Sequence, residues 1–241
     1  MARIKMVYIG GGSTRAAGTM SSFIARGSSF NGSEIVLVDL DRSRLELIQR
    51  LTQKMAKAAG VDLRISVTTN RREALNDATV VLTSLRPGGF EARHIDESVP
   101  LKYGIIGQET QGPGGFFMAL RSVSVTRGIV EDMEKVCPDA WLFNYTNLVN
   151  IVAQAVADQS DIKVVSLCEG PLVFPQIVER AAGLDPDGLW ATMIGINHNC
   201  WSVRHEYYGR IPSRLSKRLG RNGATIPPRV LWTSGSSSLP Q

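Results

Sequence analysis

A run of three glycines near the start of the chain limits most strongly what this sequence can fold into. The run, Gly10 to Gly12, follows a short apolar stretch over residues 4–9 and precedes a helical pattern over residues 15–26. A second apolar stretch, residues 34–38, comes next and ends at Asp39. Short apolar runs that are rich in β-branched residues and closed by glycine are typical of buried strands. These residues therefore predict a strand–turn–helix–strand unit.

The same alternation of helices and strands continues along the chain. Over residues 43–59, apolar side chains recur at three- and four-residue steps, which predicts a long helix. These side chains are Leu45, Ile48, Leu51, Met55 and Ala58. We further expect helices around 119–135 and 148–156, and strands at 63–67, 78–82, 141–143 and 163–167. Such alternation implies parallel pairing with right-handed crossovers. The predicted fold class is α/β, a doubly wound, Rossmann-like parallel sheet.

The basic character of the chain is confined to its end. The formal net charge is +5, from 27 Lys and Arg against 22 Asp and Glu. Six of the basic residues lie beyond Glu206, where there is no acidic residue, so residues 1–206 carry 21 bases and 22 acids. A nearly neutral body argues against nucleic acid as a partner.

The cysteines and the apolar runs indicate a compartment. Three scattered cysteines are too few for a disulfide framework, which indicates a reducing environment. No apolar run reaches the roughly 18 residues of a membrane span. The first ten residues form a strand pattern rather than the basic start and long apolar stretch of a signal peptide. We therefore expect a cytoplasmic protein without membrane contacts.

The glycine turn is a candidate nucleotide site. In a dinucleotide-binding fold, Gly10 permits the tight turn and Gly12 permits close approach of a phosphate. Ser13 and Thr14 belong to the same turn, just before the helix whose N-terminus meets the pyrophosphate, and are assigned to the cofactor. Arg15 occupies the usual third glycine position, so the fingerprint is imperfect. The alternative is a turn that only joins a strand to a helix.

Asp39 strengthens the nucleotide interpretation. It lies about 20–30 residues beyond the turn, where a carboxylate binds the ribose hydroxyls. The same charge repels a 2′-phosphate, which favours NAD over NADP. Arg86, which follows the fourth predicted strand, is assigned to the cofactor as well.

Polar, glycine-rich segments follow several of the predicted strands. Ligands of open α/β sheets bind beyond the carboxyl ends of the strands, so we expect these segments to converge there. They cover residues 86–93, 107–110, 144–147 and 168–171, and a fifth segment at 195–201 supplies a histidine.

Together these segments resemble the NAD- and Mn²⁺-dependent glycosidases of glycoside hydrolase family 4, of the 6-phospho-α/β-glucosidase, α-glucosidase and α-galactosidase type. The resemblance runs from Gly10 to Trp201. Its most specific pieces are residues 107–110 with Gly112, residues 144–147, and the pair Cys168 and His198. It implies hydrolysis of O-glycosyl bonds by redox-assisted elimination, outside the two-carboxylate scheme of most glycosidases. In the redox-assisted elimination that the resemblance implies, NAD⁺ takes a hydride from sugar C3 and later returns it, while a divalent metal stabilises the enediolate.

The resemblance also implies a metal site and an acid. Cys168 and His198 match the ligands of Mn²⁺ or another divalent metal, and substrate oxygens would complete an open site. The alternatives are a buried strand-end cysteine and a hydrogen-bonded structural histidine. Glu169 stands where some members carry a proposed leaving-group acid, a role that a raised pKa would favour. Its alternative role is to orient Cys168 or a nearby N–H.

Three further residues resemble substrate-binding residues of the family. Arg93 matches the arginine at the distal end of the sugar, which is a 6-phosphate in many members. Asn147 matches a hydroxyl-binding asparagine, and Glu109 matches an acid at the active site. The alternatives are a surface ion pair, loop capping and turn bonding, respectively. We assign structural roles to His94, His205 and Cys137.

The resemblance covers only the amino-terminal part of the family pattern. It fades after about Tyr208, and the family's proton-abstracting tyrosine has no matching position here. We therefore expect an NAD-binding domain over residues 1–170 and the start of a catalytic α+β portion, cut short, over residues 171–209. Residues 210–241 are expected to form a poorly ordered basic tail, with a third structural element as the alternative. Such a fragment would expose apolar surface, and a complete member would form a homo-oligomer, a dimer or tetramer.

Two other functions stay open. A 2-hydroxy-acid dehydrogenase of the lactate/malate type shares the nucleotide fold, but it needs an Arg–Asp–His set and no metal. A catalytically inactive NAD-binding fragment would bind the cofactor without turnover. The glycosidase interpretation covers either anomer of a free or a 6-phosphorylated glycoside.

Overall fold

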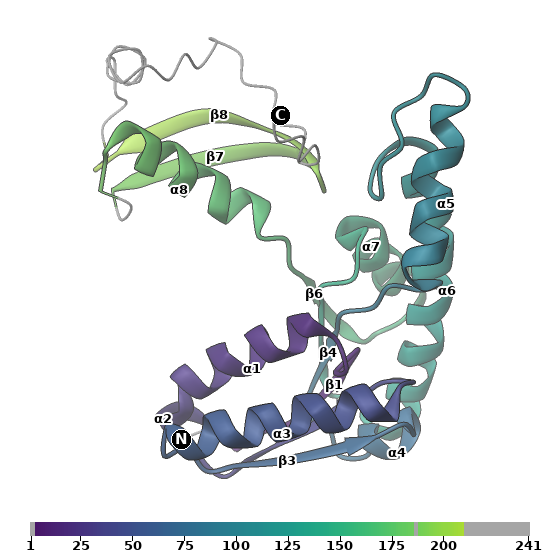
Figure 1. Cartoon of the computed structure of the whole chain (residues 1–241), viewed down its shortest axis with the longest axis vertical. Helices are drawn as coiled ribbons and strands as arrows, with labels where there is room; N and C mark the ends of the chain where they lie inside the picture. The colour runs from purple at the N-terminus through teal and green to yellow at the C-terminus, as the bar shows by residue number, and fades with distance from the viewer. Residues whose placement is uncertain (1–2, 186–187, 210–241) are drawn as a thin grey trace. The chain divides into compact units, whose positions relative to one another are not determined.

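The computed structural model describes residues 3–185 and 188–209 (Figure 1). The chain divides into two compact units. The first comprises Met1–Glu109 and Pro113–Leu167, and the second comprises Thr110–Gly112 and Cys168–Gln241. The basic tail predicted over 210–241 lies outside the described residues, and the domain limits drawn from the sequence stay predictions.

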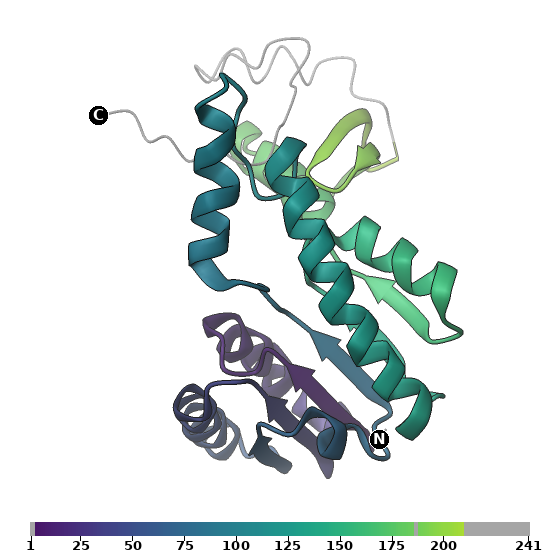
Figure 2. The same cartoon turned by 90° about the vertical axis from the view of Figure 1, so that its right-hand side faces the viewer.

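A six-stranded sheet forms the centre of the first unit (Figure 2). All its neighbouring strands pair in parallel, in the order β3-β2-β1-β4-β5-β6. The strands are β1 (Lys5–Ile9), β2 (Ser33–Val38), β3 (Leu63–Thr68), β4 (Val80–Thr83), β5 (Trp141–Asn144) and β6 (Lys163–Ser166). The strand order reverses between β1 and β4, which defines the topological switch point of a doubly wound sheet. The predicted fold class is confirmed.

The helices that accompany this sheet are α1 (Thr14–Ala25), α2 (Gly27–Phe30), α3 (Arg42–Ala58), α4 (Arg71–Leu75), α5 (Gly89–Leu101), α6 (Gly112–Val136) and α7 (Val149–Gln159). Five of them cover its two faces. Buried side chains of α1 and α3 form one apolar cluster with the sheet, and those of α4, α6 and α7 form the other. Burial on both faces explains why the strands read as short continuous apolar runs.

Helix α5 takes up part of a segment that was expected to be a glycine-rich loop. The loop after β4 ends at Gly88, which precedes α5 with a φ of 84°. A Cβ on Gly88 would lie 2.5 Å from the Cβ of Ala92, so glycine is required at this helix start. Helix α6 likewise begins earlier than expected, at Gly112 rather than near residue 119.

The second unit contains one helix and a two-stranded antiparallel sheet. These elements are α8 (Gly170–Ala182), β7 (Leu189–Ile196) and β8 (Asn199–Tyr207). Helix α8 packs against β7. Burial alternates along most of β7, with Trp190 and Ile194 exposed, so one face of the sheet is covered and the other is open. This small sheet agrees with the predicted start of an α+β portion.

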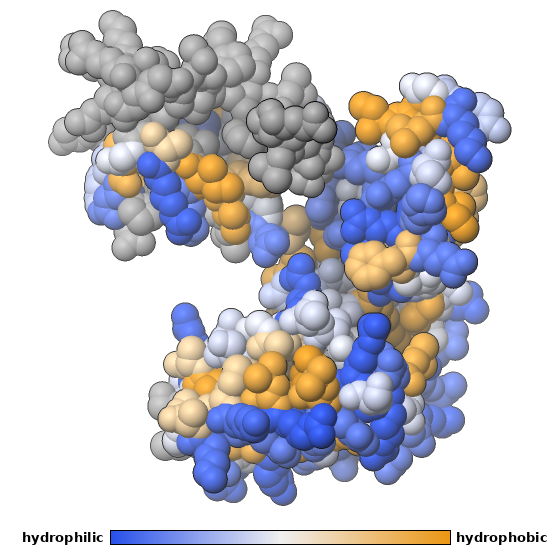
Figure 3. Space-filling model, in the orientation of Figure 1, coloured by the Kyte–Doolittle hydropathy of each residue, from blue (hydrophilic) through white to orange (hydrophobic). Residues whose placement is uncertain are grey.

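Apolar side chains are exposed in both units. In the first unit they include Leu101, Ile105 and Ile106, and Figure 3 shows apolar surface at this end of α5. In the second unit they include Trp190 and Ile194. Among residues 3–185 and 188–209, no helix is both long enough and apolar enough to cross a membrane.

Candidate functional site

The glycine turn after β1 packs against the carboxyl ends of the two neighbouring strands, β2 and β4. The N–H groups of Gly10 and Gly11 both donate to Val38 O at the end of β2, at 2.8 and 2.9 Å. Gly10 has a φ of 94°, and a Cβ there would lie 2.1 Å from Ser84 O, just beyond β4. Only glycine therefore fits at residue 10. The turn lies at the switch point of the sheet, where doubly wound folds bind their ligands.

Asp39 is in direct contact with this turn. Its Oδ2 accepts the N–H of Gly12 at 2.9 Å, and its Oδ1 accepts the N–H of Leu40 at 2.8 Å. A Cβ on Gly12 would lie 2.9 Å from the same Oδ2. The sequence assigned Gly12 the task of admitting a phosphate, and the structure adds that its missing side chain makes room for the carboxylate.

The start of α1 carries a hydroxyl that lacks a partner. Ser13 stands at the N-cap position with extended backbone (φ −82°, ψ 158°) but makes no side-chain cap bond. Its Oγ is buried and has no hydrogen-bond partner among the described residues. Buried polar atoms are normally bonded, so an acceptor from a ligand would complete this position. A phosphate at the N-terminus of α1 fits that requirement. Thr14, the first residue of the helix, is exposed.

A buried asparagine joins the carboxyl ends of three strands. The Oδ1 of Asn144 accepts from Thr83 Oγ1 and from the Thr146 N–H, each at 2.9 Å. Its Nδ2 donates to Thr146 O and to Ser166 Oγ, each at 3.0 Å. Thr146 Oγ1 in turn accepts the N–H of Leu85 at 3.0 Å, which holds the loop that leaves β4. Asn144, for which no individual role was predicted, holds the carboxyl ends of β4, β5 and β6 together.

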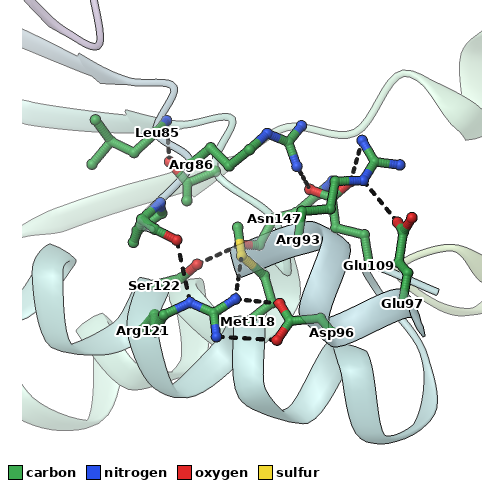
Figure 4. Close-up of polar contacts among 12 residues, drawn as sticks. Leu85, Arg86, Arg93, Asp96, Glu97, Glu109, Met118, Arg121, Ser122 and Asn147 are labelled. Carbon is green, nitrogen blue, oxygen red and sulfur yellow. Dashed lines mark hydrogen bonds and ion pairs between the residues drawn. The ribbon is translucent and has the colours of Figure 1, made fainter. Parts of the chain in front are cut away.

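Arg86, Arg93 and Glu109 form one charged group in the first unit (Figure 4). The Oε1 of Glu109 accepts from Arg86 Nη1 at 2.7 Å, and its Oε2 lies 3.4 Å from Arg93 Nη1. Arg93 Nε also donates to Glu97 at 2.7 Å. The hydrogen bond to Glu97, with the charge of Glu109, raises the pKa of Arg93 above its usual value. Three residues that the sequence singled out separately therefore contact one another.

Two consecutive residues of α6 contact segments of this region, and the sequence did not indicate them. Ser122 Oγ donates to Asn147 O at 2.8 Å, and the peptide bond that follows Asn147 is cis. Arg121 Nε donates to Pro87 O at 3.2 Å, and its guanidinium forms a two-pronged pair with Asp96. No local motif predicts these contacts, because Arg121 and Asp96 stand 25 residues apart on different helices.

The predicted metal ligands and the predicted acid lie in the second unit. Cys168 is half-buried and free, just before α8. Glu169 is exposed at the start of that helix, where its carbonyl oxygen accepts the N–H of Val173 at 2.9 Å. His198 is half-buried in the turn between β7 and β8, with a φ of 58°. Burial raises the pKa of Cys200, and the negative charge of the Cys168 thiolate raises it further.

The donor set in the second unit fits a metal ion only in part. Among residues 3–185 and 188–209, no three His, Cys, Asp or Glu side chains are grouped to hold a metal. Cys168 and His198 would supply one sulfur and one nitrogen, and the site predicted from the sequence is completed by substrate oxygens. A metal site that keeps positions open for substrate oxygens allows the ion to act as a Lewis acid.

The family of the chain follows from comparison with known proteins. A model of family 4 glycosyl hydrolases matches residues 5–184. The chain therefore belongs to family 4 of the glycosyl hydrolases, which confirms the resemblance drawn from its sequence. Family membership also favours the glycosidase interpretation over the hydroxy-acid dehydrogenase.

Several individual relatives agree with this assignment. A probable 6-phospho-beta-glucosidase of Bacillus subtilis is 41% identical over 81% of the chain and 45% of the relative. Among solved structures, a 6-phospho-alpha-glucosidase from gut microorganisms in complex with NAD and Mn²⁺ matches with a TM-score of 0.84 and 27% identity. That match covers 92% of the chain and 53% of the relative. The 6-phospho-beta glucosidase of Thermotoga maritima, with manganese, NAD⁺ and glucose-6-phosphate, matches with a TM-score of 0.79, at 25% identity over 90% and 52%. The chain thus spans about half the length of the relatives it matches.

Proposed function

We propose that this chain forms the NAD- and metal-binding part of a glycosidase that hydrolyses O-glycosyl bonds of 6-phosphorylated glucosides. The observation that carries the proposal is the contact of Gly12 with Asp39 at the switch point, beside the unpartnered hydroxyl of Ser13. Family membership supports the reaction class. The 6-phosphorylated substrate is supported by the names of the relatives and by the glucose-6-phosphate bound in one of them.

The first unit would hold the dinucleotide. Gly10 and Gly12 keep the turn free of side chains, and Ser13 Oγ–H would donate to a phosphate oxygen at the start of α1, next to Thr14. Asp39 would accept hydrogen bonds from the ribose hydroxyls, and its charge would repel a 2′-phosphate. Bound NAD⁺ would supply a hydride acceptor that is restored at the end of each cycle.

The same unit would hold the sugar phosphate. The planar guanidinium of Arg93 suits two-pronged binding of phosphate, and Glu97 and Glu109 orient it. Arg86 also donates to Glu109, so this group contains a second cation and is linked to the loop after β4. Asn147 would bind a sugar hydroxyl through its side chain, while Ser122 holds its carbonyl.

The second unit would hold the divalent metal through Cys168 and His198. The metal, Mn²⁺ or a similar ion, would act as a Lewis acid on the sugar oxygens. Glu169 would protonate the leaving oxygen, or alternatively orient Cys168; its exposure at the start of α8 is compatible with either role. A Glu169→Gln variant distinguishes them, because loss of the acid is largest for glycosides with poor leaving groups and small for nitrophenyl glycosides.

A catalytically inactive NAD-binding chain is the second candidate. The observation in its favour is that, among residues 3–185 and 188–209, no third His, Cys, Asp or Glu side chain joins Cys168 and His198 in a group that could hold a metal. We also place the protein in the cytoplasm, an assignment supported by its three free cysteines. The exposed apolar side chains of both units support the prediction of a homo-oligomer for the complete protein.

Two measurements on the purified chain test the proposal. In calorimetric titrations, NAD⁺ should bind at least about tenfold more tightly than NADP⁺. An Asp39→Asn variant should lose most of that preference, whereas Glu46→Gln, which removes an exposed carboxylate of α3, should keep it. Absence of NAD⁺ binding by the unaltered chain would overturn the proposal.

The second measurement separates the glycosidase from the inactive binder. Nitrophenyl 6-phosphoglucosides of both anomers are incubated with NAD⁺, Mn²⁺ and a thiol reductant. Release of nitrophenol that needs both NAD⁺ and Mn²⁺, without net NADH, supports the glycosidase. NAD⁺ binding without release of nitrophenol supports the inactive binder.

A further inference from the structure

Arg121 on α6 ties together the two backbone segments that carry the predicted arginines (Figure 4). Its Nε donates to Pro87 O at 3.2 Å, in the loop that leaves β4. Its Nη1 donates to Asp96 Oδ1 at 3.2 Å on α5, and Nη2 contacts the second oxygen of the same carboxylate. One guanidinium therefore binds the loop and the helix that follows it.

The geometry makes Arg121 difficult to replace. Asp96 is buried, so its carboxylate depends on these protein donors. A Cβ on Gly88 would lie 3.5 Å from Arg121 Nε, which shows how closely the loop passes the guanidinium. A lysine could keep the charge, but it lacks the planar fork that contacts the carboxylate and the Pro87 carbonyl at the same time.

Arg121 affects Arg86 and Arg93 through the main chain that carries them. Arg86 directly precedes Pro87, and Arg93 lies one helical turn before Asp96 on α5. Arg121 therefore fixes the main chain on which both arginines are mounted. These two arginines meet at Glu109, at 2.7 and 3.4 Å, so their side chains depend on that fixed spacing.

We propose that Arg121 is a positioning residue for the nicotinamide half of the dinucleotide site. This inference rests on the proposed function. A doubly wound sheet binds a dinucleotide across its two mononucleotide-binding halves. Asp39 and the glycine turn belong to the half formed by β1 to β3, whereas Arg86 and Pro87 follow β4 in the other half. Arg121 holds only the second half, so its loss should spare ligands that occupy the first.

The test compares two ligands rather than one. NAD⁺ spans both halves, whereas AMP occupies only the half that contains Asp39. In an Arg121→Gln variant, the affinity for NAD⁺ should fall about tenfold while the affinity for AMP stays within about twofold. A merely structural role would weaken both ligands equally, because loss of folded protein lowers the binding of each.

Further variants keep the test decisive if Arg121→Gln does not fold. Arg121→Lys should show a smaller loss that is again confined to NAD⁺. Asp96→Asn keeps the contact with Pro87, so it should weaken NAD⁺ by no more than about threefold. Arg127→Gln is the matched control on the same helix, because it removes only an exposed pair with Glu131 at 3.1 Å. It should leave both affinities unchanged.

The outcomes divide clearly. Selective loss of NAD⁺ affinity in the Arg121 variants, with an unaltered control, supports the inference. Equal loss of NAD⁺ and AMP, or no loss of either, overturns it while leaving the proposed function intact. Failure of the unaltered chain to bind NAD⁺ overturns the proposed function, and this inference with it.

Discussion

Gly12 donates its N–H to Asp39 Oδ2 at 2.9 Å, and a Cβ on the same glycine would lie 2.9 Å from that oxygen. Gly12 therefore positions the Asp39 carboxylate in two ways: its N–H donates a hydrogen bond, and its missing side chain leaves room for the oxygen. The turn and the predicted ribose-binding acid form one structural unit, although they are 27 residues apart in the chain. A substitution in the turn should accordingly move the Asp39 carboxylate and weaken its predicted contact with the ribose.

A Gly12→Ala substitution should displace Asp39. The added methyl group would also lie 3.2 Å from Arg44 Cβ, so the carboxylate has to move. We expect the affinity for NAD⁺ to fall at least about tenfold, measured by calorimetric titration. The protein should remain folded, because the change is confined to the turn that follows β1.

Gly18→Ala provides the matched control. Gly18 lies within α1, and a Cβ there would meet nothing within 4 Å. Alanine favours a helix over glycine by about 0.8–1 kcal/mol, so this variant should be slightly more stable and bind NAD⁺ normally. Equal NAD⁺ affinities for the two alanine variants would show that the Gly12–Asp39 contact does not shape the site.

Asn144 should contribute strongly to stability. An Asn144→Ala substitution removes four hydrogen bonds and leaves polar groups of the buried Thr83 and Thr146 and of the half-buried Ser166 without this partner. Each unsatisfied buried group costs about 1–3 kcal/mol. We expect the free energy of unfolding, measured with urea, to fall by about 3 kcal/mol or more. Ser166→Ala removes one of these bonds and should cost about 1 kcal/mol. Equal losses for the two variants would contradict the central role of Asn144.

The sheet could be predicted because its strands are buried on both faces. Continuous apolar runs and a glycine turn are local signals, and they gave the six strands of the first unit and its parallel class. The long helix after Asp39 was also predicted, but the prediction of its buried side chains was only partly correct. Its buried side chains are Leu45, Ile48, Thr52 and Ala56. Leu51 is 42% exposed, and Thr52 can be buried because its hydroxyl donates to Ile48 O at 2.7 Å.

Helices α4 and α5 and the contacts of Arg121 and Asn144 were not predicted from the local sequence. Helix α5 follows a glycine, contains Pro100 and buries the charged Asp96, so its sequence lacks an ordinary amphipathic pattern. Helix α4 has only 5 residues. The contacts of Arg121 and Asn144 join residues brought together only by the fold. The glycine turn and Asp39 could be located because a nucleotide turn imposes residue types at fixed positions in the chain.

Thiol labelling tests the proposed metal ligand. Burial raises the pKa of Cys137 to about 11, so at pH 8 only about one molecule in a thousand carries the reactive thiolate. Cys168 is half-buried and should react with iodoacetamide much faster than Cys137, as followed by peptide mass spectrometry. If Cys168 binds the metal, Mn²⁺ should slow its labelling and a chelator should restore it. Labelling of Cys168 at the same rate with and without Mn²⁺, whether or not NAD⁺ is present, would contradict the proposed ligand.

His205 should make the second unit sensitive to acid. It lies on β8 with its Nε2 2.7 Å from Ser202 Oγ, and burial lowers its pKa below the usual value near 6.5. Below that pH the unfolded chain binds a proton that the folded chain does not, so stability falls as the pH decreases and is regained above it. Hydrogen exchange of the β7–β8 amides, corrected for the intrinsic effect of pH, should show less protection at pH 5.5 than at pH 7.5. A His205→Gln variant should lose this difference, whereas His94→Gln, which replaces an exposed histidine on α5, should retain it. An unchanged difference in His205→Gln would assign the acid sensitivity to another group.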